Sequence, residues 1–594
     1  MWKQQCAIID IRNATFYRHQ YPSAHDTQES NPPLFPNLTF QLSNGGQTTP
    51  QFWSVLSPSS LARTTFLRIL AGQHICVPPA ARSYPYLVET SESLQHAIKY
   101  VGFDADRGSN VGGTSVRGAY LSARYESRRE ETDFSVHDYL TGHTELNALE
   151  RQMTATERQT LEEVTEQLNL RRLLSMPVSN LSNGQTRRAR IAKALMGRPQ
   201  VLLLDGPFMG LDPNTLANMS RVLRDLAERQ QPRLIISLRP EDGVPEWISH
   251  LVLVSEEARI LAQGAKQEVF NSKTDATKSI LFTAQLGHNA NNITRLSRDG
   301  FPQESPALKA GEPLVEMNGV EVAYGQNEAR RVVLGDWEQQ VNGEQRPGLW
   351  WSLHRGQRSG IFGANGSGKT TMLSLITSDH PQTYSLPIKL FGRSRLPAPG
   401  EAGISLFDIQ KRMGHSSPEV HAFFPKSLTV RRALESAWAD APMAKPRLDE
   451  EANRRVAACL RCFSNQRLLL FLRAIVASPD LVILDEALSG IDEATRDKAL
   501  LFLSQGETVA AVVDGVAQPS VLTQLDMVVH SGLSPDQALL VISHSKEDVP
   551  GCVREWICLP EPGEGRIPRT GKLSGPLELN PQGWGEIWGE RLPA

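Results

Sequence analysis

The sequence predicts an α/β protein in which two similar halves follow one another along the chain. Three observations predict this fold class. A strand–loop–helix unit occurs twice, a helix that runs into a buried apolar strand ending in aspartate occurs twice, and 594 residues are enough for two large domains. No apolar run approaches the ~20 residues that a membrane helix needs, so a role in transport would require partner subunits.

The composition is that of an ordinary globular protein, with 40% hydrophobic residues and a net charge of −3. This charge argues against bulk electrostatic binding of nucleic acid. Six cysteines in a chain of this length do not form a disulfide framework. The short apolar run Cys6–Ile9 is followed by Asp10, which is not typical of a signal peptide. We expect a cytoplasmic protein, with a mitochondrial location as the alternative because Lys3, Arg12 and Arg18 are basic.

The first repeated unit is a loop between a short apolar strand and a helix. It occupies residues 57–65 in the first half and 363–371 in the second. Arg63 and Lys369 hold the same place in the two loops and are 306 positions apart. We therefore expect one strand–loop–helix unit in each half.

The second repeated unit is a helix with a basic last turn followed by an apolar strand that ends in Asp205 or Asp485, 280 positions apart. Leu238 and His544, each after another short apolar strand, are again 306 positions apart. The first half is therefore 26 residues longer before its aspartate strand, and the second is 26 residues longer after it.

A segment rich in glycine, proline and charge separates the two halves, as is typical of a linker. We expect domain 1 over residues 1–290, a linker over 291–312 and domain 2 over 313–594. Each domain is predicted to combine an α/β core with a helical insert.

The loop of the second half matches G-x-x-x-x-G-K-[ST], the phosphate loop of nucleotide-binding proteins. Its glycines let backbone N–H groups converge on phosphates, and the helix that follows presents its positive N-terminus. The lysine neutralises the β- and γ-phosphates, and the threonine hydroxyl is a ligand for Mg²⁺. The residues concerned are Gly363, Ala364, Asn365, Gly366, Ser367, Gly368, Lys369, Thr370 and, directly after them, Thr371.

The apolar strand 481–484 ends in Asp485 and Glu486. A buried strand of this kind delivers the aspartate to the metal ion, and the glutamate beyond it is a candidate general base for the attacking water. With Thr370, Asp485 is the predicted metal ligand. An apolar strand that merely ends in acidic residues is the alternative, which the phosphate loop upstream makes weaker.

In the first half, Leu181-Ser182-Asn183-Gly184-Gln185 opens a helix just before the Asp205 strand. The order of the motifs resembles that of the ABC ATPase family. It runs from the phosphate loop and helical insert to this L-S-x-G-Q string, the aspartate strand, Ser489–Asp492 and a histidine after a strand. The resemblance occurs twice and covers nearly the whole chain. The resemblance implies two tandem P-loop ABC-type nucleotide-binding domains. The chain is similar to twin ATPases without membrane spans, such as the soluble molybdate-type ATPase of bacteria and its fungal counterparts.

The resemblance also implies a head-to-tail arrangement in which each ATP lies between the phosphate loop of one half and the signature string of the other. Site A would combine the second half's loop, Asp485, Glu486 and His544 with Ser182, Gly184 and Gln185 of the first half. In the family an aromatic residue stacks on adenine where this chain has Tyr324; an ordinary tyrosine at a strand end is the alternative. Lys369, Glu486 and His544 are the expected catalytic residues.

One departure from the family concerns site A. The glutamine expected before the helical insert is missing from Gly414–Glu419. Either Glu419 substitutes for it or Pro418 simply turns the chain.

The other composite site, site B, is degenerate in each of its parts. Its loop, Ser57–Thr65, has no glycine, and Arg63 replaces the lysine. Gly206 follows Asp205 in place of a carboxylate base, and Leu238 stands where histidine would be. The second half's signature is also poor. Its candidate registers are Cys462-Phe463-Ser464-Asn465 and Phe463-Ser464-Asn465-Gln466, and neither restores L-S-x-G-Q.

The sequence thus predicts an ATPase that hydrolyses Mg-ATP at site A and retains site B as a structural or weakly binding counterpart. The alternative explanation for the losses in site B is a generally decayed gene. For function, the alternatives are the ATP-binding subunit of a transporter with separate membrane subunits and a ribosome- or nucleic-acid-directed twin ATPase. The protein partner and the process coupled to hydrolysis are not indicated by the sequence.

Overall fold

The computed structural model divides into two compact units. The first comprises Met1–Ser115, Glu131–Met209 and Thr215–Ala290, and the second comprises Val116–Glu130, Gly210–Asn214 and Asn291–Ala594. The residues that the structure describes are 7–18, 21, 31–43, 50–103, 134–143, 153–178, 181, 183–271, 277, 280–281, 296–305, 307–324, 331–397, 399–400, 402–417, 420, 424–425, 427–439, 444–463, 468–489, 491–513, 516–563 and 565–589.

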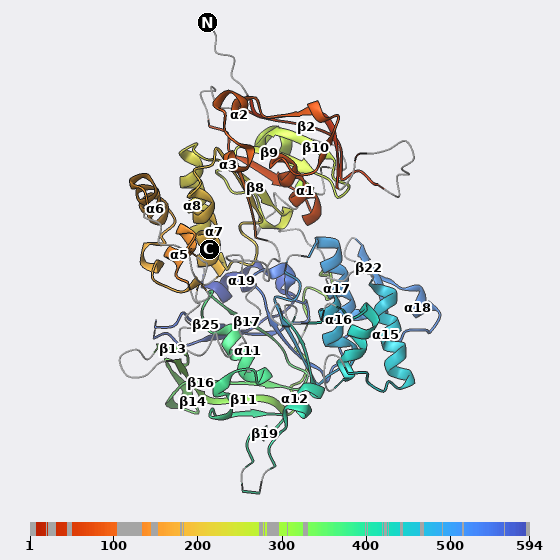
Figure 1. Ribbon diagram of the computed structural model, residues 1–594. Helices are drawn as coiled ribbons and strands as arrows, with labels where there is room; N and C mark the ends of the chain where they lie inside the picture. The colour runs from red at the N-terminus through yellow and green to blue at the C-terminus, as the bar shows by residue number, and fades with distance from the viewer. Residues whose placement is uncertain are drawn as a thin grey trace. The chain divides into compact units, whose positions relative to one another are not determined.

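The first unit contains a six-stranded sheet and a smaller antiparallel sheet (Figure 1). In spatial order the six strands are β10 (Ile260–Ala265), β9 (His250–Val254), β3 (Trp53–Leu56), β8 (Arg233–Leu238), β7 (Val201–Asp205) and β6 (Ile98–Gly102). All neighbours are parallel except β10 and β9. The smaller sheet consists of β1 (Ala7–Tyr17), β2 (Phe35–Ser43), β4 (Ile75–Val77) and β5 (Arg82–Ser83).

Helix α1 (Ser60–Leu70) packs between these two sheets and carries the core of the first unit. The ring of Phe66 lies 5.4 Å from that of Phe40 on the antiparallel sheet, at a near-perpendicular angle. Val55 and Leu203 close the core from the other side. The short helices α2 (Pro85–Thr90), α3 (Leu94–Ala97) and α9 (Lys266–Phe270) lie at its periphery.

A helical insert separates β6 from β7 in the first unit. It contains α5 (Val136–Thr141), α6 (Ala155–Gln167) and α7 (Asn183–Leu195), and α8 (Pro213–Glu228) follows β7. Ser135 and Thr154 begin α5 and α6 with capping boxes, in which the side chain of the cap and that of the third helical residue satisfy each other's backbone N–H groups.

The second unit repeats the strand order of the six-stranded sheet and again places a smaller antiparallel sheet beside it. Its six-stranded sheet has the order β20 (Met413–Ser416), β21 (Leu481–Asp485), β24 (Ala538–Ile542), β17 (Arg358–Gly363), β25 (Glu555–Leu559) and β26 (Arg569–Lys572), with only β26 antiparallel. The antiparallel sheet consists of β16 (Leu349–His354), β11 (Pro313–Val320), β18 (Ile388–Leu390) and β19 (Arg393–Ser394). The internal repeat predicted from the sequence is therefore a repeat of sheet topology.

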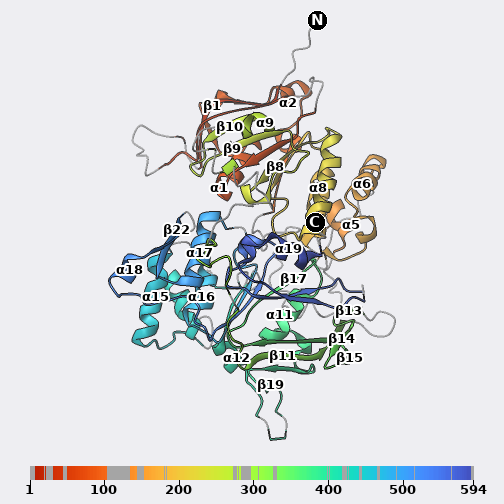
Figure 2. The ribbon, with the colours of Figure 1, turned by 180° about the vertical axis from the view of Figure 1, so that it is seen from behind.

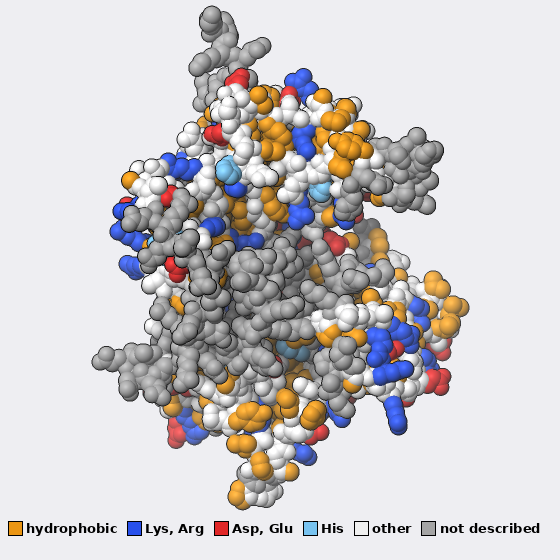
Figure 3. All heavy atoms as spheres, in the orientation of Figure 1, with side chains coloured by type: hydrophobic (Ala, Val, Ile, Leu, Met, Phe, Trp, Pro, Cys, Tyr) orange, Lys and Arg blue, Asp and Glu red, His pale blue; other side chains and the backbone are white. Residues whose placement is uncertain are grey.

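Helix α11 (Lys369–Thr377) fills the place between the sheets that α1 fills in the first unit. Two hairpins lie between β11 and β16 in sequence, β12–β13 (Val322–Tyr324 and Arg331–Leu334) and β14–β15 (Glu338–Val341 and Glu344–Pro347). The helical insert contains α14 (Val430–Glu435), α15 (Glu450–Cys462) and α16 (Leu469–Val476), and lysine and arginine side chains gather on its outer face (Figure 3). Further helices of this unit include α12 (Leu406–Arg412), α17 (Glu493–Gln505) and α19 (Pro581–Trp588).

An extra element accounts for the additional length of the second half after its aspartate strand. Between α17 and β24 the chain forms β22 (Val509–Val513), β23 (Val516–Pro519) and α18 (Val521–Gln524), whereas in the first unit α8 leads to β8 after four residues. Both ribbon views place this element at the outer edge of the second unit, beside α15 (Figure 2). Apolar side chains are exposed there, among them Val521 and Leu525, which are 66% and 60% exposed.

The described part of the predicted linker packs against the second unit. The Asp299 carboxylate is buried and accepts hydrogen bonds from the Ser297 hydroxyl, the Ser504 hydroxyl and the Gly551 backbone N–H. Among the described residues, no helix is long and apolar enough to cross a membrane.

Candidate active site

The phosphate loop of the second unit links the end of β17 to the start of α11. Gly363, Gly366 and Gly368 have φ angles of 139°, 92° and 89°, which residues with a side chain rarely adopt. A Cβ atom on Gly363 would lie 2.6 Å from the Leu559 carbonyl oxygen, and one on Gly368 would lie 2.9 Å from the Val333 carbonyl oxygen. These two glycines are required by both conformation and space.

Lys369 is the first residue of α11 and is buried. Its ammonium group donates hydrogen bonds to the carbonyl oxygens of Gly363 and Ala364, both at 2.8 Å. Burial lowers the pKa of Lys369, and the charges of Glu486 and Asp485 act in the opposite direction. Of the other predicted loop residues, Ser367 and Thr371 are buried, Asn365 and Thr370 are half-buried, and Gly366 is exposed.

Asp485, Glu486 and His544 meet at the same edge of the sheet as this loop. Strand β24 lies between β17 and β21, all three are parallel, and Asp485 pairs with Ile542 in register. The carboxyl ends of the three strands therefore converge. His544 Nε2 lies 3.6 Å from Glu486 Oε1.

The C-terminal helix α19 packs against this edge of the sheet. The ring of Trp588 lies 6.3 Å from that of His544, and the ring of Trp584 lies 5.8 Å from that of Phe362 in β17. Neither tryptophan was predicted from the sequence, because neither belongs to a motif and each contact joins residues far apart in the chain.

Glu486 has a φ of 45°, which is unusual for a residue with a side chain. Gly206, in the same place in the first half, has a φ of 66°. The turn after the aspartate strand thus has the same handedness in both halves. Glycine adopts it without strain, whereas glutamate is held there at a cost of about 1 kcal/mol.

Tyr324 ends β12, and its partner in the hairpin is Arg331. Its hydroxyl group lies 2.6 Å from Nε2 of the buried His380, which follows α11. His380 belongs to no sequence motif and was not predicted as a site residue.

The corresponding loop of the first unit has a different conformation. Residues 57–65 are all described, and none of them has a positive φ. Helix α1 begins at Ser60, three residues before Arg63, whereas α11 begins at Lys369 itself. The Ser59 hydroxyl caps the helix by accepting the Ala62 N–H. Without glycines, the residues that would form a phosphate cradle have become the first turn of a helix.

The Arg63 guanidinium is buried and donates to the Ser57 carbonyl oxygen. Its positive charge also affects the pKa of the buried Asp242. Burial acts to raise the pKa of Asp242, but Arg239, 2.7 Å away, and Arg63 outweigh it and lower the pKa.

The Asp205 carboxylate of the first unit is enclosed by hydroxyl groups. Thr64 and Tyr100 donate to Oδ2 at 2.6 and 2.8 Å, and Ser237 donates to Oδ1 at 2.6 Å. In the second unit the residue equivalent to Ser237 is Ser543, whose hydroxyl donates instead to the Ser545 carbonyl oxygen. His415 stands in the place of Tyr100 and has no hydroxyl group. This cage was not predicted from the sequence, because its threonine, tyrosine and serine belong to no motif.

The signature string of the first half is only partly described. Gly184 is buried in the first turn of α7, where a Cβ atom would lie 2.6 Å from the Thr215 side chain, and Gln185 is half-buried. Ser182 lies outside the described residues, as do Ser464, Asn465 and Gln466 of the second half's candidate signature and Pro418 and Glu419. Leu238 is buried at the end of β8, so no imidazole is present there.

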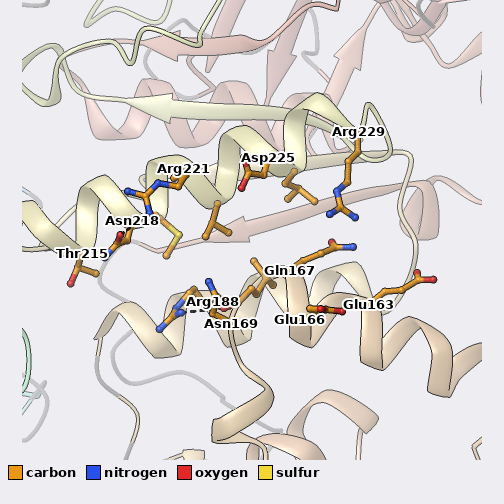
Figure 4. A pocket seen from close by; sticks show the side chains of 14 residues that line it. Glu163, Glu166, Gln167, Asn169, Arg188, Thr215, Asn218, Arg221, Asp225 and Arg229 are labelled. Atoms are coloured by element: carbon orange, nitrogen blue, oxygen red, sulfur yellow. Dashed lines mark hydrogen bonds between the residues drawn. The ribbon is translucent and has the colours of Figure 1, made fainter.

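A polar hollow of about 700 Å³ lies in the first unit between α8 and the segment that includes α6 and Asn169 (Figure 4). Arg221, Asp225 and Arg229 line it from α8, while Glu163 and Glu166 line it from α6. Charges of both signs are mixed along its walls, so the hollow does not select an anion or a cation by charge.

The fold, and the geometry of the sheet edge that carries the phosphate loop and Asp485, are those of a P-loop ATPase domain. Comparisons of sequence identify the family. The model of the ABC transporter family matches residues 63–209 and 348–489. An uncharacterized ABC transporter ATP-binding protein of Schizosaccharomyces pombe is 32% identical over 565 residues, which are 92% of this chain and 96% of that protein. The chain belongs to the ABC ATP-binding protein family.

Two further relatives have the same character. An uncharacterized ABC transporter ATP-binding protein of Saccharomyces cerevisiae is 29% identical over 86% of this chain and 94% of its own length. The ABC transporter ATP-binding protein ModF of Escherichia coli is 29% identical over 66% of this chain and 72% of its own length. The predicted likeness to fungal and bacterial twin ATPases is therefore confirmed.

Proposed function

We propose that this protein hydrolyses Mg-ATP at one composite site, site A, and that site B is not hydrolytic. The contrast between the two phosphate loops is the observation that carries the proposal. One loop has three glycines with positive φ and a buried lysine on their carbonyl oxygens. The other has become a helical turn, with an arginine in place of the lysine.

In site A the phosphate loop and the N-terminus of α11 would hold the phosphates by backbone N–H groups. Lys369 would move from the carbonyl oxygens of its own loop to the β- and γ-phosphates. Glu486 would act as the general base for the attacking water, and His544, 3.6 Å away, would orient that carboxylate and the γ-phosphate.

Thr370 and Asp485 are suitable ligands for Mg²⁺, because a hydroxyl and a carboxylate oxygen are the donors that this ion prefers. The equivalent pair in the first unit, Thr64 and Asp205, is in direct hydrogen-bond contact at 2.6 Å, which supports the proximity of these two positions in the fold. A bound Mg²⁺ would neutralise the charge that develops on the phosphates.

In site B the carboxylate of Asp205, which is equivalent to Asp485, already accepts three hydrogen bonds from hydroxyl groups. A metal ion at Asp205 would have to displace three hydroxyl donors, and Gly206 offers no base. The losses fall on the parts of one composite site, which favours a specialised twin over a generally decayed chain. Ser182, Gly184 and Gln185 would complete site A by reaching the γ-phosphate across the two halves.

A second candidate is the ATP-binding subunit of a transporter whose membrane subunits are separate chains. The fungal and bacterial relatives bear the name ABC transporter ATP-binding protein, which favours this candidate. Both candidates use the same ATPase chemistry and differ in the protein partner, which co-purification from membranes or from the cytoplasm would distinguish.

The proposal is tested by comparing Lys369→Ala with Arg63→Ala in the full chain. Lys369→Ala is expected to lower the ATPase rate roughly 10²-fold or more, since it removes the cation that stabilises the transferred phosphate. Arg63→Ala is expected to leave the rate within about twofold once the two proteins are matched for folded content by circular dichroism. Equal losses in the two variants would refute the asymmetry.

A further inference from the structure

The segment that follows the phosphate-loop helix contacts the strand that carries Tyr324. Helix α11 ends at Thr377, and the N–H groups of Asp379 and His380 both donate to the Ser374 carbonyl oxygen, at 2.9 and 3.2 Å. The segment continues as a short helix, η6 (Pro381–Tyr384). It is therefore fixed to the same helix whose first residue is Lys369.

The imidazole of His380 is held in one orientation. The side chain is only 1% exposed, and Nδ1 accepts the Gln382 backbone N–H at 3.1 Å. The remaining ring nitrogen, Nε2, lies 2.6 Å from the Tyr324 hydroxyl. Because Nδ1 is an acceptor, we assign the proton to Nε2, which donates it to the tyrosine oxygen.

Burial lowers the pKa of His380 to about 4, so the ring is neutral near pH 7. A neutral ring with one donor and one acceptor fits the two contacts that surround it. The hydrogen bond to Tyr324 is thus present over the whole physiological pH range.

A second contact ties the same two segments together. The Gln382 side-chain amide donates to the carbonyl oxygen of Ala323, the residue before Tyr324, at 2.7 Å. His380 and Gln382 therefore hold both the backbone and the side chain at the end of β12.

The hairpin that carries Tyr324 also borders the phosphate loop. A Cβ atom on Gly368 would lie 2.9 Å from the carbonyl oxygen of Val333 in β13, the partner strand of β12. The tyrosine is thus carried by a hairpin that abuts the loop proposed to hold the phosphates of ATP.

We propose that His380, together with Gln382, is a positioning residue that fixes the ring of Tyr324 for contact with the adenine base. This inference rests on the proposed function, because it assumes that ATP occupies the loop beside Lys369. Without the hydrogen bond, the ring would sample other rotamers, and part of the base contact would be lost. Loss of this hydrogen bond is expected to weaken the affinity for ATP roughly 3- to 10-fold, or about 0.7–1.4 kcal/mol, which lies within the range that a single hydrogen bond contributes.

The experiment compares His380→Asn, Tyr324→Phe, the double variant, Gln382→Ala and Tyr324→Leu in the full chain. The readouts are KM and kcat for ATP and the inhibition constant of tripolyphosphate, which has the phosphates but no base. His380→Asn and Tyr324→Phe are each expected to raise KM about 3- to 10-fold, with kcat and the tripolyphosphate constant within twofold of wild type. Because both remove the same hydrogen bond, the double variant is expected to resemble either single variant.

The control is His530→Asn, which changes another buried histidine of the second unit that accepts a backbone N–H and stacks on Phe502. It is expected to leave KM unchanged. Should His380→Asn fold poorly, Gln382→Ala removes the second hydrogen bond between the two segments. Because this side chain is only half-buried, the variant is expected to fold and to raise KM as well.

An unchanged KM in His380→Asn and Gln382→Ala, with a raised KM in Tyr324→Leu, would overturn the positioning role and leave the proposed function intact. An equal rise for ATP and tripolyphosphate would also overturn it, because it would show a general distortion of the loop. An unchanged KM in Tyr324→Leu would refute the base contact itself, whereas the Lys369 and Arg63 variants test hydrolysis independently.

Discussion

At Glu486 the backbone has a φ of 45°, and the residue in the same place in the first half is Gly206, with a φ of 66°. The fold therefore requires a left-handed residue after this strand whether or not chemistry takes place there. A glutamate in this strained conformation is consistent with the role proposed for its carboxylate.

We predict that Glu486→Gln leaves ATP binding intact and slows hydrolysis by ~10²-fold or more, as loss of a general base does. Glu486→Gly is expected to be equally inactive and no less stable than wild type, because glycine relieves the strain. Single-turnover hydrolysis, nucleotide affinity and thermal unfolding measure the three effects. Glu450→Gln, at the exposed start of α15, is the control, and near-normal hydrolysis in Glu486→Gln would refute the one-site assignment.

Glu578 is an ionisable group whose environment differs strongly from water. Burial raises its pKa to about 7, although Arg298, 2.9 Å away, acts to lower it. Since the folded pKa lies above the ordinary value of 4.5, the folded state binds this proton more tightly than the unfolded chain. The resulting contribution to stability is full below pH 4.5 and is lost as the pH rises through 7.

Glu578→Gln removes this titration. Wild type is expected to lose about 2–3 kcal/mol of unfolding free energy between pH 5 and pH 8 that the variant does not lose. Thermal or urea unfolding at the two pH values measures the difference, with the exposed Glu451→Gln as control. A difference between variant and wild type that does not change with pH would contradict the prediction.

At the scale of elements, the extra hairpin and helix of the second unit enter and leave the fold at neighbouring points. The Glu507 N–H donates to the His530 carbonyl oxygen at 2.7 Å, and the Glu507 carboxylate accepts the N–H groups of Val529 and His530. The ion pair with Arg461, at 2.8 Å, holds this base against α15.

We predict that replacing residues 509–527 by a two-glycine turn leaves the chain folded and the ATPase rate within about twofold of wild type. The physical reason is that the removed apolar side chains are mostly exposed, so little buried surface is lost. Steady-state ATPase activity and the unfolding temperature test this. A deletion elsewhere of equal length, across α16, is the control and should prevent folding, because α16 is buried.

The sequence predicted the repeated elements well because their signals are strong. Strands that end at Gly363, Asp205 and Asp485 are where the apolar runs placed them. The early start of α1 was not predicted, since the repeat suggested a loop of equal length and the capping role of Ser59 is visible only in three dimensions. Likewise, the hydroxyl cage of Asp205 and the contact of His380 with Tyr324 join residues far apart in the chain.

At the scale of the whole molecule, the two halves are unequal in complementary ways. The phosphate loop is intact in the second half, and the signature string is intact in the first. If ATP is hydrolysed, the proposed site A therefore needs both halves of one chain, and the tandem arrangement raises the effective concentration of each for the other.

We predict that Ser182→Arg abolishes hydrolysis and leaves ATP bound to the Lys369 loop, because the bulky cation would block completion of site A. The matching change, Ser464→Arg, is expected to lower the rate by no more than about threefold. The measurement is ATPase rate beside nucleotide affinity for both variants. An active Ser182 variant with an inactive Ser464 variant would reverse the assignment of signatures to sites.

The early start of α1 has an evolutionary consequence. Reverting Arg63 to lysine would place an ammonium group on a helical turn with no phosphate cradle before it. Restoring the glycines first would put residues that disfavour helix, at about 1 kcal/mol each, into a turn that now contributes to the packing of α1. Under the proposed function, each single substitution toward a phosphate loop would therefore bring a loss or no benefit, so the early start of α1 would act as a ratchet.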